Sequence, residues 1–530
     1  MIGSSSGRKL AGLLALVLAV GWAAACTTSI STGTPALHVL AGSELKDLEP
    51  MLPDLQSATG LNLKFDYIGT LDGAQAISSG DSHALAWFSS NRYLTLLPGA
   101  GSKILAQQRI VLSPVVLGVK RSTAQRFGWE GNPGVTWKDI AARASAGQFA
   151  FAMTDPSASN SGFSALVGVA SALAGTGSAL TSPDITAHAD ALKALFAGQR
   201  LTAGSSGFLA DSYVKEQDSL DGIVNYESVL LGLNVGGTLK EPLDLIYPKE
   251  GIVTADYPLM LLDSSHRSDY DKLVAYFRKP DVQTRIMTQT HRRPAIPEVQ
   301  PDSQFPNQVL VEVQFPASLD VVNQLIEVYL NQVRLPSHAY FVLDISGSMD
   351  GDRINGVKAT FANLTGADQT ITGQFARFRA REDITIITFN DKVRATRDFT
   401  INDPTPGSAD LKRVLDFVNS LQAGGGTAIY DALVHAFTLA GQAKASDPNR
   451  FYSVVLMTDG QNNAGRNAGQ FQSFYHSASP DVRSIKCFAI IFGEASPQEL
   501  NDVANLTGGR TFDARGTNLS IVFKEIRGYQ

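Results

Sequence analysis

Apolar residues alternate along most of the chain between short extended runs and faces with helical spacing. In the first half, the expected strands are residues 36–41, 61–68, 110–119 and 149–153, and the expected helices are residues 135–145 and 161–174. Strands that alternate with helices at this spacing are typical of βαβ units. The pattern therefore predicts an α/β region with a mainly parallel sheet.

Prolines interrupt the pattern in the middle of the chain. Residues 269–289 have helical spacing, but Pro280 lies among them and should kink or break the helix. Several prolines follow within residues 292–308, which predicts a stiff linker. Residues 318–333 then place apolar side chains on one helical face, and Pro336 ends that pattern.

A second alternation of strands and helices begins near residue 339. Its expected strands are residues 340–344, 383–389, 453–458 and 484–492, with an antiparallel edge strand at 393–400, and its helices are residues 353–364, 408–421, 429–443, 497–506 and 518–527. This order is typical of one doubly wound α/β domain. Together the patterns predict a domain over residues 36–295, a Pro-rich linker with a connecting helix over 296–335, and a domain over 336–530.

The first residues have the layout of an export signal. Arg8 and Lys9 precede an apolar run that ends at Ala25. The run is shorter than the roughly 20 residues that a transmembrane helix needs. Small residues stand directly before Cys26, which resembles a bacterial lipobox and implies cleavage before Cys26 and lipidation of that residue. An ordinary signal peptide with an incidental cysteine is the alternative.

This layout sets the expected location of the protein. Residues 1–25 form the lipoprotein signal peptide in this interpretation, and residues 26–35 form a flexible tether. The rest of the chain is then exported and held by a lipid anchor at the extracellular or periplasmic face of a membrane.

Composition excludes several classes of function. The chain has 530 residues, with 44 Lys and Arg against 50 Asp and Glu, so the net charge of −6 argues against nucleic-acid binding. Two cysteines rule out a disulfide framework or a Cys-rich zinc module. We find no HExxH motif, no Walker-type phosphate loop and no Ser–His–Asp arrangement. The sequence therefore predicts a protein that is not an enzyme.

Three short segments in the last part of the chain carry oxygen ligands. Each follows an expected strand or opens a helix, and the side chains are Asp344, Ser346, Ser348, Thr427 and Asp459. In an open α/β sheet, ligands bind beyond the carboxyl ends of the strands. Carboxylates and hydroxyls are hard donors, which suits Mg²⁺, with Mn²⁺ or Ca²⁺ as other candidates. The alternative is that the Asp and Ser side chains only cap a helix.

In this order the segments DxSxS, a threonine after glycines, and TDG resemble the von Willebrand factor A (VWA) family. The resemblance covers about the last 195 residues. It implies a metal-ion-dependent adhesion site (MIDAS) formed by the five side chains, in which the two serines ligate directly and Thr427 and Asp459 ligate directly or through water. It also implies a protein partner that offers a carboxylate to the metal. Without a cation, we expect Asp344 and Asp459 to repel each other.

The first domain carries serine-rich phrases at expected helix starts. In order and spacing they resemble extracellular solute-binding proteins of the phosphate, sulfate and molybdate-like kind, over residues 36–295. The resemblance implies two α/β lobes with a cleft between them, and crossovers near residues 110–119 and 246–259. Its candidate ligand residues are Ser43, Ser89, Ser90, Ser157, Ser159, Asn160, Ser161 and Tyr226.

The chemistry of these helix starts suits a small anion or another small solute. Hydroxyls and free backbone N–H groups at a helix N-terminus attract negative charge. The alternative is that these residues are ordinary caps and turns with no ligand.

The combined interpretation is an exported, lipid-anchored binding protein in which a Mg²⁺-dependent adhesion domain is coupled to a solute-binding-like domain. Two other interpretations remain open. The chain could be the substrate-binding receptor of an ABC-type transporter, with the VWA domain as a docking module, or a metal-dependent hydrolase. The missing general base argues against the hydrolase.

Overall fold

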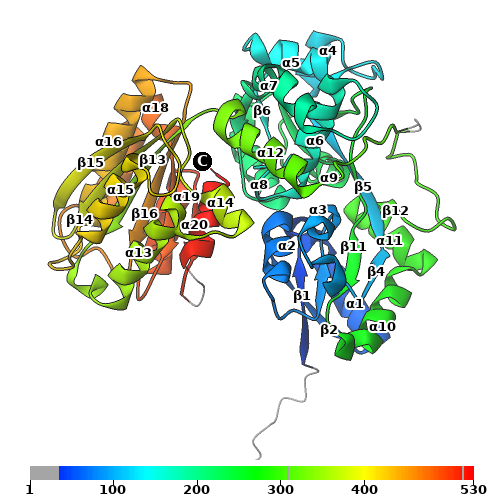
Figure 1. The fold of residues 1–530 in the computed structure, drawn as a ribbon, viewed down its shortest axis with the longest axis horizontal. Coiled ribbons are helices and arrows are strands. Elements are labelled where there is room, and N and C mark those ends of the chain that lie inside the picture. The colour runs from blue at the N-terminus through cyan, green and yellow to red at the C-terminus, as the bar shows by residue number, and fades with distance from the viewer. Residues whose placement is uncertain (1–34, 307–309, 516–518, 530) are drawn as a thin grey trace, which may run out of the picture. The chain divides into compact units, whose positions relative to one another are not determined.

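The computed structural model describes residues 35–306, 310–515 and 519–529. The expected signal peptide, Cys26 and most of the tether lie outside the described residues. Within the described ranges, no helix has both the length and the apolar character needed to cross a bilayer. The described chain contains three β-sheets, which Figure 1 labels by element.

The first sheet forms a lobe that contains the beginning and the end of the expected solute-binding region. Its strand order is β2 (Asn62–Tyr67), β1 (Ala36–Ala41), β3 (Leu85–Trp87), β11 (Pro258–Leu261) and β4 (Ala106–Arg109). The helices of this lobe are η1 (Ser43–Met51), α1 (Leu52–Thr59), α2 (Thr70–Ser78), α3 (Arg92–Leu96), η2 (Gly101–Lys103), η4 (Ser264–His266), α10 (Arg267–Phe277) and α11 (Pro280–Thr290). As predicted, the helix breaks at Pro280, which begins α11, where a missing N–H costs nothing.

The second sheet forms a second lobe. Its order is β10 (Thr254–Ala255), β5 (Val111–Lys120), β8 (Gly222–Tyr226), β6 (Phe151–Ala152) and β7 (Gln199–Leu201), with β9 (Leu243–Ile246) and β12 (Arg293–Pro294) also paired to β5. Its helices are α4 (Arg121–Phe127), α5 (Trp137–Ser145), α6 (Asn160–Ala174), α7 (Ser182–Phe196), α8 (Ser206–Glu216), η3 (Gln217–Ser219) and α9 (Glu227–Val235).

Both lobes have mixed sheets, so the prediction of a mainly parallel sheet is wrong for this region. Strand β11 is antiparallel to β3 and β4, and β5 is antiparallel to β8, β9 and β10. The physical reason is that the chain leaves the first lobe through β4 and β5 and returns through β10 and β11. A returning strand pairs in the opposite direction to the one it joins.

The two crossings lie side by side. The first is at Ile110 and the second is at Asp256 and Tyr257, and the Ile110 N–H donates to the Tyr257 carbonyl at 3.3 Å. The N–H groups of Asp256 and Tyr257 both donate to the Ser89 carbonyl at 3.0 Å. These residues lie where the crossovers were expected, and they connect the two lobes.

The segment expected as a linker packs against the second lobe. Val311 and Val313 exchange backbone hydrogen bonds of 2.9 Å with Ile252. The expected helix is α12 (Leu319–Val328), which continues as the π-helical turn η5 (Tyr329–Val333). The Tyr329 hydroxyl donates to Gln199 Oε1 at 3.0 Å. This helix is therefore held by tertiary contacts rather than free.

The third sheet has six strands and is parallel except at one edge. Its order is β15 (Val393–Ile401), β14 (Glu382–Phe389), β13 (Ser337–Asp344), β16 (Phe451–Thr458), β17 (Lys486–Ile491) and β18 (Arg510–Asp513). Its helices are η6 (Gly347–Met349), α13 (Asp352–Ala362), η7 (Asn363–Ala367), α14 (Ile371–Ala376), α15 (Ala409–Asn419), α16 (Ile429–Ser446), α17 (Ala468–Ser477), α18 (Pro480–Arg483), α19 (Pro497–Leu506) and α20 (Leu519–Arg527). Strand β15 is antiparallel to β14, as predicted.

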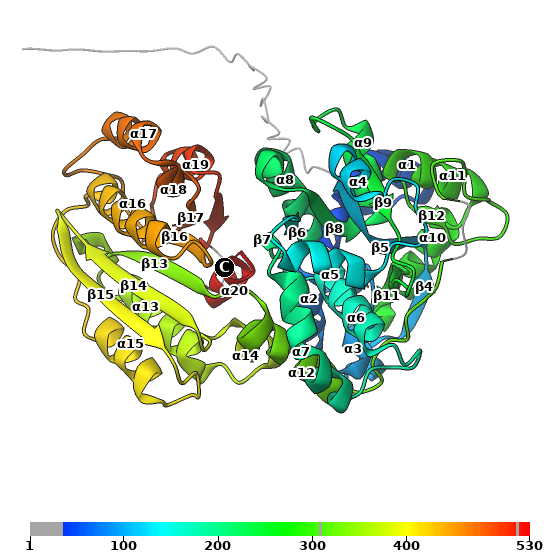
Figure 2. The same ribbon diagram turned by 90° about the horizontal axis from the view of Figure 1, so that it is seen from above.

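Helices cover both faces of this third sheet, as Figure 2 shows. Helices α16, α17 and α19 pack on one face, and α13, α15 and α20 pack on the other. Burial on both faces explains why the central strands β13 and β16 are apolar almost throughout. The polar residues that follow these strands therefore stand out at the carboxyl edge of the sheet.

Candidate functional site

Two neighbouring strands bring the two predicted carboxylates to one edge of the third sheet. Strand β13 ends at Asp344, and the parallel strand β16 ends at Thr458, directly before Asp459. The strands are in register, with Leu343 opposite Met457. Because parallel strands end at the same edge, Asp344 and Asp459 emerge next to each other.

Hydrogen bonds link four of the five predicted metal ligands. The Ser346 N–H donates to Asp344 Oδ1 at 2.7 Å, and the hydroxyls of Ser346 and Ser348 lie 3.1 Å apart. The Ser348 hydroxyl donates to Asp459 Oδ1 at 2.7 Å. The hydroxyls of Ser346 and Ser348 and one Asp459 oxygen therefore lie close together, and Asp344 is tied to them through the Ser346 backbone.

The fifth side chain, Thr427, faces the same space from the loop before α16. A Cβ atom built on Gly460 would lie 3.3 Å from Thr427 Oγ1 and 3.7 Å from Ser348 Oγ. The Thr427 backbone is fixed by Asn463, whose side-chain oxygen accepts from the Thr427 N–H at 2.7 Å. Sequence reasoning did not identify Asn463, because an Asn in a polar loop has no distinctive pattern.

The electrostatics of this site favour a bound cation. Asp344 is 2% exposed, and burial raises its pKa to about 6, against hydrogen bonds from the Thr458 hydroxyl and from Ser346. The negative charge of Asp459 raises the pKa of Asp344 further. A divalent cation would stabilise both carboxylates in their charged form.

The donor set fits a hard cation. In the part of the chain that the structure describes, no group of three or more His, Cys, Asp or Glu side chains could hold a metal. The site at the sheet edge thus depends on hydroxyls and water as well as on Asp344 and Asp459. Mg²⁺ tolerates such a shell, because it keeps several waters and needs few carboxylates.

One cation of the protein itself also reaches this site. Arg353, in the first turn of α13, contacts Asp459 Oδ2 through Nη1 and donates to the Ser348 carbonyl at 3.3 Å. This ion pair offsets part of the repulsion expected between Asp344 and Asp459. Sequence reasoning missed Arg353, because a basic residue near a helix start is usually solvated.

Three candidates of the solute site meet between the lobes of the first region. The Tyr226 hydroxyl donates to Ser89 Oγ at 2.7 Å, and Asn160 Nδ2 donates to the Tyr226 oxygen at 3.2 Å. Ser89 follows a strand of the first lobe, whereas Asn160 and Tyr226 belong to the second lobe. The hydrogen bond from Tyr226 to Ser89 therefore crosses the predicted cleft, whereas the bond from Asn160 lies within the second lobe.

Three further candidates contact the start of α8. The Ser161 hydroxyl is 2.8 Å from the hydroxyls of Thr154 and Ser206, and Ser159 Oγ is 3.4 Å from Ser206 Oγ. Ser43 Oγ accepts from the Gly207 N–H at 3.3 Å, which is a second contact between the lobes. Ser206 was not predicted, although it begins α8 in the same manner as the serines that were.

The remaining two candidates have local partners. Ser90 Oγ accepts from the Arg92 N–H at 3.2 Å, as a turn residue does. Ser157 donates to Asp155 Oδ1 from both its N–H and its hydroxyl, at 2.7 and 2.6 Å. The structure therefore does not join Ser90 and Ser157 to the contact at Tyr226.

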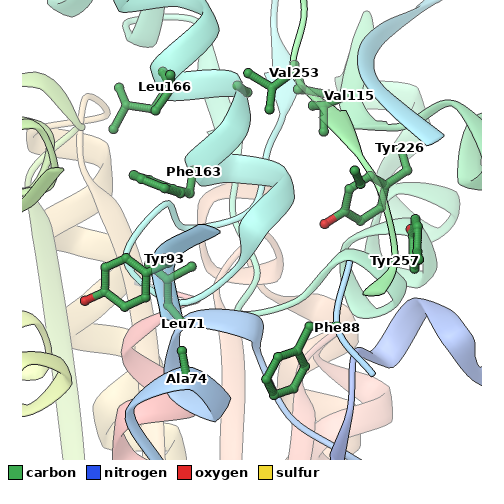
Figure 3. Close-up of a cluster of buried hydrophobic side chains, with 14 of the residues drawn as sticks. Leu71, Ala74, Phe88, Tyr93, Val115, Phe163, Leu166, Tyr226, Val253 and Tyr257 are labelled. Carbon is green, nitrogen blue, oxygen red and sulfur yellow. The ribbon is translucent and has the colours of Figure 1, made fainter. Parts of the chain in front are cut away.

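Apolar side chains fill much of the space between the lobes. Figure 3 shows Tyr93 from the first lobe beside Phe163 from the second, with ring centroids 6.1 Å apart, and Tyr226 beside Tyr257 at 5.9 Å. Seven of the eight predicted solute ligands are at most 7% exposed. Side chains of the two lobes therefore contact each other directly across the predicted cleft.

A buried acid that the sequence did not reveal lies in this closed region. Glu44 is 7% exposed, and burial raises its pKa, against the positive charge of Arg292. Fully buried Arg292 donates to Asp47 Oδ2 at 2.6 Å and to the Glu44 carbonyl at 2.9 Å, with its guanidinium 5.0 Å from the centre of the Tyr257 ring. Asp47 and the Tyr257 ring already stabilise the positive charge of Arg292. This arginine is therefore not available to bind the predicted anion.

Comparison with known proteins gives the family of the C-terminal region. Residues 339–523 match the family model of the von Willebrand factor type A domain, so this region is a VWA domain. Inter-alpha-trypsin inhibitor heavy chain H2 from Homo sapiens is 30% identical over 134 residues, which are 25% of this chain. The match spans 13% of the length of that human protein.

The N-terminal region is similar in structure to periplasmic binding proteins. AfuA from Actinobacillus pleuropneumoniae, with fructose-6-phosphate bound, is 13% identical with a TM-score of 0.44, and the match covers 57% of this chain and 99% of AfuA. The sulfate-binding protein SubI from Mycobacterium tuberculosis is 17% identical with a TM-score of 0.42, covering 55% of this chain and 96% of SubI. The two separate sheets of this region, each with its own helices, confirm the predicted α/β fold with two lobes.

Proposed function

We propose that this chain is an exported, non-catalytic binding protein whose VWA domain captures a partner protein through a divalent cation. The observation that carries this proposal is the linked set of oxygens from Asp344, Ser346, Ser348 and Asp459 at one sheet edge. Mg²⁺ is the expected ion, with Mn²⁺ and Ca²⁺ as alternatives. Attachment through a lipid on Cys26 belongs to the same proposal and is supported by the sequence alone.

The site is arranged for access from solvent. Ser348 is exposed, whereas Asp344 and Asp459 lie below it at 2% and 1% exposure. Asp344, Ser346, Ser348, Thr427 and Asp459 would hold the ion. A bound cation supplies a positive charge and an open coordination position to which a carboxylate of the partner can bind. The residues of this chain orient that position, and the bound cation would keep the buried carboxylates charged.

Metal titration of the purified protein tests this proposal. We expect Asp344→Asn to weaken Mg²⁺ binding by about 100-fold or more, because it removes one of the two buried negative charges of the ligand set. Isothermal titration calorimetry with Mg²⁺ and Mn²⁺ measures the affinity. The matched control is Asp350→Asn, an exposed acid of the same loop, which should bind like wild type. Equal affinities for wild type and Asp344→Asn would show that the oxygens only cap the loop.

A second candidate function is that the N-terminal region binds a solute. The solute would either act on this protein alone or be delivered to a transporter for which the protein is the receptor. A groove of about 470 Å³ lies beside the closed contact between the lobes. Its lining includes Ser43, Glu44, Asp47, Phe208, Asp211 and Leu233. The lining also includes Lys46 and His291, but its three acids, Glu44, Asp47 and Asp211, outnumber them, which suits a cationic or neutral solute better than the small anion that the sequence predicted.

Thermal shifts with a solute panel test the second candidate. We expect an organic amine or a neutral polar solute to raise the melting temperature, and sulfate or phosphate to leave it unchanged. A ligand at 100 times its dissociation constant adds about 2.7 kcal/mol to stability. Glu44→Gln should reduce the shift caused by an amine. A shift by anions alone would restore the sequence prediction, and no shift with any solute would contradict this candidate.

A further inference from the structure

We propose that Arg353 is a built-in counter-charge of the metal site, which lowers its affinity for free cations and couples cation binding to the arrival of an acidic partner. This inference rests on the proposed metal function. It adds a residue outside the motif, with a role that concerns regulation rather than ligation.

The first support is that Arg353 already pairs with the Asp459 carboxylate, which a bound metal would need as a ligand. Its Nη1 contacts Asp459 Oδ2, while Asp459 Oδ1 accepts from the Ser348 hydroxyl at 2.7 Å. Both oxygens of Asp459 thus have partners in the protein. The Asp459 side chain is fully buried, so the ion pair is poorly screened by solvent.

The second support is that the fold provides a place for the guanidinium. Gly493 has a φ of +56°, and a Cβ atom there would lie 2.8 Å from Arg353 Cζ and 3.0 Å from Asp459 Cβ. A side chain at position 493 would therefore displace Arg353. Because α13 begins at Asp352, the backbone of Arg353 is also fixed by the helix.

These contacts give Arg353 opposite effects in the two states of the site. Without a metal, its positive charge stabilises Asp459 beside Asp344. With a divalent cation bound, the guanidinium and the ion repel each other. Both effects lower the affinity for a cation on its own.

An acidic partner offsets the repulsion between Arg353 and the bound cation. A carboxylate at the open coordination position brings a negative charge close to both the ion and the guanidinium. The side chain of Arg353 is 31% exposed, so it can reach solvent and the partner. Cation and partner are then held more tightly together than either is alone, which is positive coupling between two ligands.

Calorimetric titration of the full-length protein tests this inference. We expect Arg353→Gln to bind Mg²⁺ and Mn²⁺ about tenfold more tightly than wild type, since a nearby like charge is removed. The melting temperature of the metal-free variant should fall, and its rise on adding Mg²⁺ should be larger than for wild type. If Arg353 had a purely structural role, the substitution would lower the melting temperature of the metal-free protein without enlarging its rise on adding Mg²⁺.

Two further variants separate charge from geometry. Arg353→Lys keeps the charge and should stay close to wild type in affinity. Arg394→Gln removes a charge from an exposed position on the edge strand and should leave the affinity unchanged. If Arg353→Gln binds no more tightly than wild type, or if Arg353→Lys tightens binding equally, the inference is wrong while the metal function stands. If wild type and all the variants bind no cation, the metal function itself is wrong.

Discussion

Replacing Glu382 with Ala should lower the stability of the VWA domain by about 3–5 kcal/mol, because it removes one partner from a buried ion cluster. Glu382 is 2% exposed at the start of β14. It accepts from Arg527 Nη2 at 2.6 and 2.7 Å and also contacts Arg334 Nη2. The variant would leave two buried guanidinium groups without their shared carboxylate. Urea denaturation followed by circular dichroism measures the loss.

The effect of Glu382 should also depend on pH. Burial raises the pKa of Glu382, but the positive charges of Arg527 and Arg334 outweigh it and hold that pKa below its ordinary value. A lowered carboxyl pKa adds stability above the unfolded pKa of about 4.3, and this stability is lost as pH falls through the folded pKa. The control Asp416→Asn removes an exposed pair with Lys412 and should change little. A Glu382→Ala loss below 1 kcal/mol at neutral pH would contradict the prediction.

The second large effect is expected for Arg292→Leu in the N-terminal region, again about 3–5 kcal/mol. This substitution removes the positive charge that faces Asp47 and Glu44 from a fully buried position. Chemical denaturation of the full-length protein measures it. The control is Arg285→Leu, whose guanidinium pairs with Asp54 but is 37% exposed.

The Arg292 variant should recover stability at low pH. Burial raises the folded pKa of Glu44, so its charged form carries a penalty that protonation removes as pH falls through the folded pKa. Without Arg292 this penalty grows, and the loss at pH 8 should exceed the loss at pH 5. An equal loss at both values would show that packing against Tyr257, rather than charge, accounts for the effect.

The sequence was most informative where one local pattern sufficed. The apolar run before Asp344 and the DxSxS phrase after it predicted both a central strand and the polar edge that follows. Pro280 predicted a helix break, and the alternating segment at β15 predicted an antiparallel edge strand. Each of these features depends on periodicity or on the backbone chemistry of one residue.

Features that depend on distant partners were not predicted. Arg292 lies far from Asp47 in sequence, and nothing near either residue indicates an ion pair. Arg353 and Asp459 are joined only because β13 and β16 are neighbours, so that α13 begins beside the TDG loop. The mixed sheets have the same origin, since strand direction follows from where the chain returns and not from the composition of the strand.

Ser89 takes part in both the second crossing of the chain and a hydrogen bond between the lobes. Its carbonyl accepts from the N–H groups of Asp256 and Tyr257 at the second crossing, and its hydroxyl accepts from Tyr226 of the opposite lobe. The second crossing between the lobes and the contact with Tyr226 therefore share a single residue. A molecule that displaced the Tyr226 hydroxyl would act directly on the residue that also anchors the returning chain.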